Sequence, residues 1–513
     1  MSKKEIWVVP FFGQGHLFPS IELCKQIASR NINTLLVIPS NLSFSVPSSL
    51  RQYPLLQIAE IQPTSTPPPQ PGPDPGHQPP HGHPDQFEMG LENLLQAQAT
   101  NPDSVRPICA ILDVMMDWTA EIFKKFDVPT IGFFTSGACS AAMEHALWKA
   151  HPIDLKPGEV RLLPELPEEM AVTYFDTKRR AHEPPGPPPP LFGAGYHGPI
   201  MGGTHGPSGP PPPPHSGRAG PRQRGPPKHG GQPPWVEGLE GSIALMINTC
   251  DDLERPFIEN IAKQMGRPVW GVGPLLPEQY WKSISSILHD HESRNNRQSS
   301  VSEDEVIQWL DSKPRGSVLY VCFGTEVGPS MEEYSQLAQA LEATTQPFIW
   351  VVQSGAGRSG PPRPPNLGTA QEGYFPHGLA SQVGPRGLII NGWAPQLLIL
   401  SHPSTGGFLT HCGWNSTVEA IGLGVPLLGW PIRGDQHYNV KLAVAYLKVG
   451  FMISDDLLEK VKKDEIVKGI EKLMSDYDIK SQAKKLAAKF QNGFPNSSTA
   501  NLDAFIDIIK SLT

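Results

Sequence analysis

Residues 393–436 of this 513-residue chain read WAPQLLILSHPSTGGFLTHCGWNSTVEAIGLGVPLLGWPIRGDQ, and they decide the fold. The apolar run from Gly407 to Thr410 is typical of a buried parallel strand, and His411 follows it directly. Residues 413–416 then open a helical pattern. A strand that leads at once into a helix is the unit of an open α/β sheet, whose ligands lie at the carboxyl ends of the strands. The stretch therefore predicts a parallel sheet with a binding site beside His411.

The polar and aromatic side chains of this stretch match the parts of a nucleotide sugar. Trp393 offers a flat face on which a base can stack, and Gln396 offers amide contacts near the same ring or its ribose. The start of the helix presents backbone N–H groups to a diphosphate. Glu419 could accept hydrogen bonds from ribose hydroxyls, and Asp435 and Gln436 follow the next strand, where a sugar would lie. A single Trp or His is more often structural, so the prediction depends on the joint spacing.

Over its full length and without a gap, the stretch closely resembles the plant secondary product glycosyltransferase signature of the UDP-dependent glycosyltransferases of family 1. The resemblance implies an α/β protein with two Rossmann-like β/α/β domains that face each other across a cleft, the GT-B architecture. It implies that the donor UDP-sugar is bound by Thr135, Gly324, Thr325, Trp393, Ala394, Gln396, His411, Trp414, Asn415, Ser416, Glu419, Asp435 and Gln436. Glu326 is an acidic neighbour of the phosphate-contacting turn, and the sequence gives no account of it.

The catalytic residues are expected in the first half of the chain. Gly13 to His16 follow the first apolar run directly, which predicts that His16 lies in the crevice at the carboxyl edge of the sheet. Asp113 ends another strand-like run at the same edge and could orient the imidazole by accepting from one ring nitrogen. The resemblance makes His16 the catalytic base and Asp113 its partner. Asp117, one helical turn further on, is the less favoured substitute.

Apolar runs alternate with helical patterns along the chain, which favours βα units on parallel sheets. The predicted domains are an acceptor-binding Rossmann-like domain at 1–274 with Pro- and Gly-rich inserts at about 63–84 and 183–235, a linker at 275–310, a UDP-sugar-binding Rossmann-like domain at 311–490, and a C-terminal helix at 491–513 that crosses back to the first domain. Predicted strands are Ile6–Phe12, Thr34–Ile38, Ile108–Asp113, Val128–Phe134, Ile243–Thr249, Val318–Phe323 and Phe348–Val352. Predicted helices are Pro19–Arg30, with proline at its first position, Met331–Glu342, Glu465–Met474, Ile479–Phe490 and Leu502–Ile509.

Composition narrows the class of protein. The net charge of −8 gives no general attraction to nucleic acid or to anionic membranes. Six cysteines occur without a C-x-x-C pair, which indicates reduced thiols and a cytoplasmic location. The first apolar run is too short for a secretory signal, and no apolar stretch is long enough to span a bilayer. We expect a monomer without stable membrane insertion whose partners are a UDP-sugar and a small acceptor.

The predicted activity is inverting transfer of glucose from UDP-glucose to a hydroxyl of a small plant acceptor, a phenolic such as a flavonoid being the family's prior. Trp414 and Gln436 favour glucose, because the family's glucuronosyl enzymes can carry a cation at the former position and its galactosyl enzymes often carry His at the latter. No cofactor and no metal is expected, since Asp476-Tyr477-Asp478 is interpreted as a helix boundary. The alternatives are a non-catalytic UDP-sugar sensor or scaffold that docks partners through its Pro-rich inserts, and a hydrolase or retaining enzyme, which would need a second carboxylate near Asp113.

Overall fold

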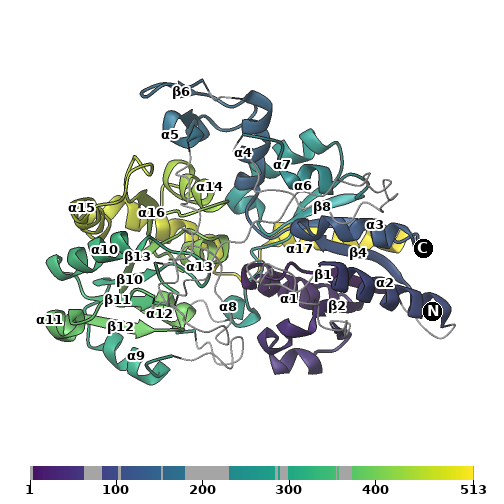
Figure 1. The fold of residues 1–513 in the computed structure, drawn as a ribbon, viewed down its shortest axis with the longest axis horizontal. Coiled ribbons are helices and arrows are strands. Elements are labelled where there is room, and N and C mark those ends of the chain that lie inside the picture. Colours follow the sequence, from purple (N-terminus) through teal and green to yellow (C-terminus); the bar gives the residue numbers. More distant parts are fainter. Residues whose placement is uncertain are drawn as a thin grey trace, which may run out of the picture.

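Two parallel sheets, each covered by helices, stand side by side and form two domains (Figure 1). The computed structural model describes residues 4–62, 84–101, 105–151, 154–178, 230–282, 287–288, 299–353, 355–357 and 373–511. The inserts predicted at 63–84 and 183–235 lie almost wholly outside these residues. The two-domain α/β fold confirms the predicted fold class.

The first sheet has seven strands in the order β3-β2-β1-β4-β5-β8-β9, and every adjacent pair in it is parallel. Its strands are β1 (Glu5–Val9), β2 (Asn33–Pro39), β3 (Leu56–Ile61), β4 (Pro107–Asp113), β5 (Thr130–Phe134), β8 (Ala244–Ile247) and β9 (Val269–Gly271). β1, β5 and β8 are buried along their whole length, as expected of strands that helices cover on both faces. β1 stops before Pro10, which has no N–H to donate, so the predicted strand was three residues too long.

The helices of the first domain connect these strands in sequence. They are α1 (Gln14–Ala28), α2 (Pro84–Thr100), α3 (Ala120–Lys124), α4 (Ala138–Ala150), α5 (Tyr174–Thr177), α6 (Pro234–Gly238) and α7 (Asp251–Met265), with a small antiparallel pair, β6 (Val160–Arg161) and β7 (Val172–Thr173). Trp235 in α6 is buried against Phe134, although the sequence placed it at the end of a surface insert. An aromatic ring at the edge of a low-complexity segment can belong to the core.

The second sheet has six parallel strands in the order β12-β11-β10-β13-β14-β15, which is the strand order of a Rossmann fold. Its strands are β10 (Val318–Cys322), β11 (Phe348–Val352), β12 (Gly387–Asn391), β13 (Thr405–Thr410), β14 (Leu427–Gly429) and β15 (Gly450–Met452). Its helices are α9 (Glu303–Asp311), α10 (Met331–Ala343), α11 (Leu379–Val383), α12 (Gln396–Ser401), α13 (Trp414–Gly422), α14 (Gln436–Lys441), α15 (Lys463–Ser475) and α16 (Tyr477–Ala487).

Helix α9 and the short helix α8 (Glu278–Lys282) occupy part of the stretch predicted as a linker. A capping box between Ser302 and Glu305 starts α9, and Val306 and Leu310 are fully buried. The sequence interpretation took the acidic residues for a polar linker and overlooked this helix start. Asp476 accepts a hydrogen bond from the backbone of Ile479 at the start of α16, so the D-x-D spelling there is the helix boundary that the sequence indicated.

The start of helix α1 differs from the prediction. The helix begins at Gln14 and not at Pro19, which lies inside it. Because proline has no N–H, the carbonyl of Gly15, one turn earlier, lacks its usual helical partner. Asn415 of the second domain donates its side-chain N–H to that carbonyl at 3.2 Å. The carbonyl of Gly15, which has no helical partner because of Pro19, thus accepts a hydrogen bond from the second domain instead.

The C-terminal helix α17 (Asn496–Ser511) lies against the first domain (Figure 1). Leu502, Phe505, Ile506 and Ile509 are buried in the same apolar cluster as β1 and β8. Ser498 donates to the carbonyl of Gly273 at 2.6 Å. The last helix of the chain thus completes the core of its first domain.

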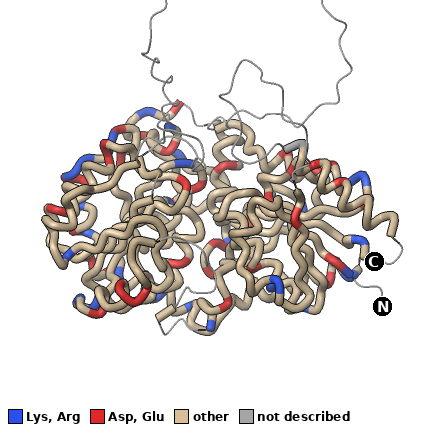
Figure 2. Tube along the Cα trace, turned by 60° about the horizontal axis from the view of Figure 1, so that its bottom comes forward, with Lys and Arg blue, Asp and Glu red and all other residues tan. Residues whose placement is uncertain are grey.

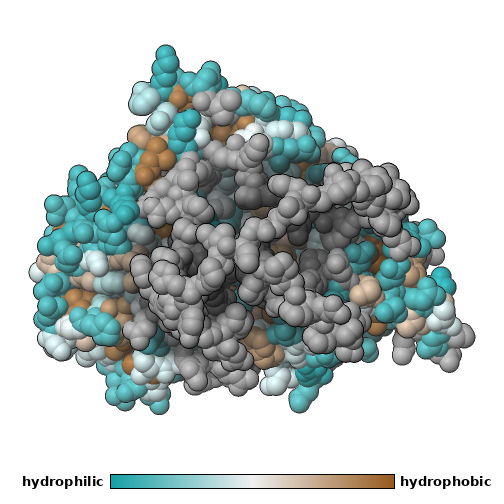
Figure 3. Space-filling view, viewed as in Figure 1, coloured by the Kyte–Doolittle hydropathy of each residue, from teal (hydrophilic) through white to brown (hydrophobic). Residues whose placement is uncertain are grey.

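Positions of both charge signs are interspersed along the Cα trace of both domains (Figure 2). The visible surface of the described residues is mostly hydrophilic, with small scattered apolar patches (Figure 3). In the described part of the chain, no helix has the length and apolar character that crossing a bilayer requires.

Candidate functional site

His16 lies in the first turn of α1, which follows β1 after four residues, so its ring stands at the carboxyl edge of the first sheet. Its Nδ1 is 2.8 Å from Oδ2 of Asp113 and 2.9 Å from Oγ1 of Thr135. A carboxylate can only accept, so Nδ1 carries the proton and Nε2 is left as an acceptor. The side chain is 30% exposed, which leaves it accessible from the space between the domains.

Asp113 ends β4 and is buried. Each oxygen of its carboxylate has a hydrogen-bond partner. Oδ2 faces His16, and Oδ1 accepts from the backbone N–H of Met115 at 2.9 Å. Asp117 turns elsewhere: its Oδ1 accepts from the N–H of Trp118, and its side chain lies against Gly238. Of the two acidic residues considered from the sequence, the structure places Asp113 beside His16.

Two opposed effects act on the pKa of His16. Burial lowers it, but the Asp113 carboxylate, through its charge and its hydrogen bond, and the more distant Glu326 and Asp435 raise it, and the net pKa lies above the ordinary value of 6.5. A base with a raised pKa has a stronger affinity for the proton it removes. It also loses activity earlier as the pH falls.

His411 follows β13 and lies between two turns of the second domain. A Cβ atom on Gly324 would come within 2.8 Å of the ring, and one on Gly413 within 2.6 Å, so only glycine lets both backbones approach it. Burial and the positive charge of Arg433 lower the pKa of His411 to about 4, which keeps the imidazole neutral. Its Nδ1 is buried and has no hydrogen-bond partner among the described residues, so it is available to a ligand.

Gln396, Ser416 and Glu419 form one hydrogen-bonded group where α12 and α13 begin. The amide nitrogen of Gln396 donates to Oγ of Ser416 at 3.0 Å and to Oε2 of Glu419 at 2.6 Å. Trp393 lies just before them and is partly exposed, and Ala394 between them is buried. The structure thus groups the residues predicted to hold the ribose.

Asp435 and Gln436 lie on the turn between β14 and α14, where Asp435 meets the first domain. Oδ2 of Asp435 accepts from Oγ of Ser136 at 2.7 Å and from the side chain of Asn439 at 2.9 Å. Oε1 of Gln436 accepts from the backbone N–H groups of Ile432 and Arg433, at 2.9 and 3.0 Å. The carbonyl of this amide therefore stabilises its own turn, and the NH₂ group remains for a ligand.

Trp414 was predicted to bind the donor, but its side chain points into the first domain. The indole Nε1 donates to the backbone carbonyl of Asn248 at 2.6 Å, and the ring is buried. The spacing of the stretch places the residue correctly at the helix start but does not determine the side-chain direction. Its backbone N–H still belongs to the first turn of α13, where an anion would lie.

Glu326, for which the sequence gave no account, forms an ion pair with Arg433 at 3.1 Å. The pair joins the turn after β10, which carries Gly324 and Thr325, to the turn that carries Asp435. Oε1 of Glu326 also lies 3.1 Å from the position of a Cβ on Gly13, in the opposite domain. The acidic charge beside the predicted phosphate turn is thus balanced by a cation.

Ser136 and Asn248 join the two domains at this edge, and Glu254 lies close by at Gly137; the sequence interpretation missed all three. Ser136 follows Thr135 after β5, and Asn248 follows β8, so both lie at carboxyl ends of strands that the sequence did predict. Polar residues at those ends were the available signal. Glu254 gave none, because its partners lie far away in the sequence.

Glu254 is fully buried and accepts hydrogen bonds from the first backbone N–H groups of α4, those of Ala138 at 2.8 Å and Cys139 at 2.7 Å. Burial raises the pKa of Glu254 to about 7, in spite of these hydrogen bonds. The carboxyl group therefore changes its charge near neutral pH, beside Gly137 at the start of α4.

As the pH rises from 5.5 to 8, the melting temperature of the wild type should fall relative to that of Glu254→Gln. The folded protein keeps the proton of Glu254 up to about pH 7, whereas the unfolded chain releases it near 4.5, so the wild type loses unfolding free energy over this range. Melting temperatures of both proteins at pH 5.5, 6.5 and 8 should diverge by a few degrees. Glu305→Gln, at an exposed helix start, is the control and should show no such trend. A pH-independent difference for Glu254→Gln would contradict the prediction.

Known proteins resemble the chain in sequence and in fold. A family model described as UDP-glucoronosyl and UDP-glucosyl transferase matches residues 281–488. UDP-glycosyltransferase 73C13 of Barbarea vulgaris is 28% identical over 98% of this chain and 96% of its own length, and scopoletin glucosyltransferase of Nicotiana tabacum is 28% identical over 92% and 90%. The crystal structure of Glycyrrhiza uralensis UGT73P12 complexed with glycyrrhetinic acid 3-O-monoglucuronide covers 100% of this chain and 96% of that chain, with a TM-score of 0.72 at 22% identity. That of TcCGT1 in complex with UDP has a TM-score of 0.69 at 20% identity and covers 100% of both chains.

The fold is that of a two-domain GT-B protein. The family model over residues 281–488 and the plant UDP-glycosyltransferases at 28% identity agree with the resemblance that the signature stretch indicated. These matches support UDP-sugar-dependent glycosyltransferase activity on small acceptors.

Proposed function

We propose that the chain transfers glucose from UDP-glucose to a hydroxyl of a small plant phenolic, with inversion at the anomeric carbon and without a metal ion. The observation that supports this proposal most is the arrangement of His16. Its Nδ1 is paired with Asp113, which leaves Nε2 to accept a proton, and the charge of Asp435 in the second domain acts on the same ring. A sensor that only binds UDP-sugar has no need of such a base.

The proposed reaction begins with the acceptor hydroxyl at Nε2 of His16. His16 removes the proton as the oxygen attacks the anomeric carbon from the face opposite UDP, which inverts the configuration. Asp113 holds Nδ1–H, so the ring keeps the tautomer that can accept, and it stabilises the imidazolium that forms. The products are the glucoside, UDP and a proton on His16 that passes to solvent.

The leaving UDP gains negative charge, which the second domain would stabilise. The N-terminus of α13 provides backbone N–H groups at Asn415 and Ser416, and neutral His411 provides a polar ring nitrogen beside them. In this proposal, Trp393 stacks on the base, Gln396 and Glu419 bind the ribose, and the turn at Gly324 and Thr325 contacts the phosphates.

The test is an assay of the purified chain with UDP-glucose and a panel of phenols, flavonoids and terpenoid alcohols, with product masses measured. A new mass of acceptor plus one hexose from the phenols supports the proposal. UDP binding without any product would favour the sensor, and release of free glucose would favour the hydrolase. Product from UDP-glucuronate or UDP-galactose but not from UDP-glucose would overturn the donor assignment.

Gln436→His is expected to lower the rate with UDP-glucose about tenfold or more, because the sugar loses an amide donor in a buried site. Affinity for UDP should change little. The transfer rates are measured with UDP-glucose and with UDP-galactose, using one acceptor. Calorimetry measures the affinity for UDP. In Gln436→Glu, a carboxylate oxygen can still accept from Ile432 and Arg433, so this variant keeps the turn and tests the loss of the NH₂ group alone. Unchanged UDP-glucose kinetics in both variants would show that Gln436 does not contact the sugar.

A further inference from the structure

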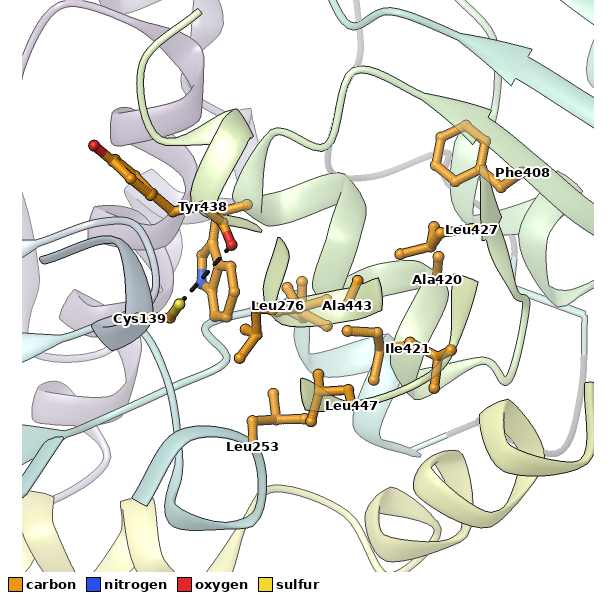
Figure 4. Packing of buried hydrophobic residues seen from close by; sticks show 14 of the residues in the cluster. Cys139, Leu253, Leu276, Phe408, Ala420, Ile421, Leu427, Tyr438, Ala443 and Leu447 are labelled. Atoms are coloured by element: carbon orange, nitrogen blue, oxygen red, sulfur yellow. Dashed lines mark hydrogen bonds between the residues drawn. The ribbon is translucent and has the colours of Figure 1, made fainter. Parts of the chain in front are cut away.

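The two domains meet along an interdomain seam formed by Gly137, Cys139 and Asn248 of the first domain and Trp414 and Tyr438 of the second. The Trp414 ring lies so close to Gly137 that a Cβ there would be 2.6 Å from it. Beside it, Cys139 approaches the carbonyl of Tyr438 at 3.8 Å, and Leu253 and Leu447 continue the same apolar cluster (Figure 4). The seam is therefore a closely packed contact and not a loose approach of two surfaces.

Within this seam, Trp414 is connected to His16 by three consecutive links. Its Nε1 donates to the carbonyl of Asn248 at 2.6 Å. The side chain of Asn248 donates to the carbonyl of Thr135 at 3.1 Å and accepts from the N–H of Leu275 at 2.7 Å. Oγ1 of Thr135 is 2.9 Å from Nδ1 of His16. Asn248 and Trp414 are buried, and Thr135 is nearly so, which makes each lost link costly.

We propose that Trp414 is a positioning residue that acts across the seam: by holding Asn248, and through it Thr135, it fixes the ring of His16 only while the two domains are in contact. The inference rests on the proposed function, in which His16 is the base. The sequence predicted that Trp414 contacts the donor. In the present proposal its indole instead positions His16, the base that acts on the acceptor. The second domain thereby supplies part of the geometry of the first domain's base.

The first test is Trp414→Phe, which keeps an aromatic ring in the seam but removes the indole N–H together with part of the ring volume. Trp350→Phe is the matched control, because Trp350 is also fully buried and its N–H has no partner among the described residues. We expect Trp414→Phe to lower kcat about tenfold, with UDP affinity by calorimetry within about twofold of the wild type. Wild-type kcat in Trp414→Phe, or a loss confined to UDP affinity, would overturn the proposal.

A second measurement needs no substrate and separates this proposal from the proposed function. The His16 ring is followed by NMR in protein with isotope-labelled histidine, its signal being assigned by its absence in His16→Ala. A ring released from Thr135 also holds Asp113 less firmly, so His16 should titrate at lower pH in Trp414→Phe than in the wild type or in Trp350→Phe. Identical titration in all three proteins would sink the proposal even if the chain forms glucosides. A shift in a chain that forms none would refute only the proposed function.

A double-mutant cycle tests whether the effect passes through Thr135. Thr135→Val removes the hydroxyl at nearly constant volume. If the links act in series, Trp414→Phe adds little in a Thr135→Val background, so the two losses in kcat are not additive. Fully additive losses would mean that Trp414 acts by another path, against the proposal.

Discussion

His16→Ala is expected to lose about a hundredfold or more of the transfer rate, since general-base catalysis contributes at least that much. UDP affinity should stay near that of the wild type, because the residues predicted to hold UDP lie in the second domain. The measurements are kcat with UDP-glucose and one phenolic acceptor, and calorimetry with UDP. His377→Ala, at an exposed position of the second domain, is the control and should behave as the wild type. Wild-type turnover in His16→Ala would refute the assignment of the base.

Asp113→Asn is expected to reduce kcat by about a hundredfold as well, for a different reason. Its amide oxygen can still accept from the N–H of Met115, which leaves the NH₂ group facing Nδ1 of His16. Nδ1 must then accept, the proton moves to Nε2, and the ring can no longer take a proton from the acceptor. Asp117→Asn is the matched control and should retain most of the activity, since Asp117 turns away from His16.

The pH profile should distinguish this effect from a general loss of structure. Asp113 helps to raise the pKa of His16 above 6.5, so the wild-type activity should fall as the pH drops through that raised value. In Asp113→Asn the remaining activity should persist to lower pH, because the charge that raised the pKa is gone. An acid limb of kcat/KM at the same pH in both proteins would contradict this role of Asp113.

The sequence predicted the strands of the two sheets and the residues at their ends well, because strands and their ends leave local signals. An apolar run followed by a polar turn placed His16, Asp113 and His411 at carboxyl ends of parallel strands, where the structure has them. Helix limits were predicted less well: Pro19 suggested a helix start, since proline favours the first turn. The structure keeps it inside α1, where Asn415 satisfies the carbonyl that it leaves free.

Side-chain directions and contacts between the domains could not be predicted from spacing. Trp414 has the right place in the signature, but which way its indole turns depends on Gly137 and Asn248, more than 160 positions away in the chain. Glu254 lies within a helical pattern that looks ordinary, and its role as a cap for α4 arises only when the fold brings the two helices together. Such long-range partners leave no periodic signal in a single sequence.

The position of α17 has a consequence for how the protein is made. The ribosome synthesises the chain from its N-terminus, so β1 emerges before the second domain, and Leu502 to Ile509, which cover the sheet of β1, emerge after it. The first domain therefore waits, with part of its core open, while the whole second domain is synthesised. During that interval its exposed apolar surface is a target for chaperones, and a nonsense mutation between the second domain and Leu502 would leave the first domain without part of its core.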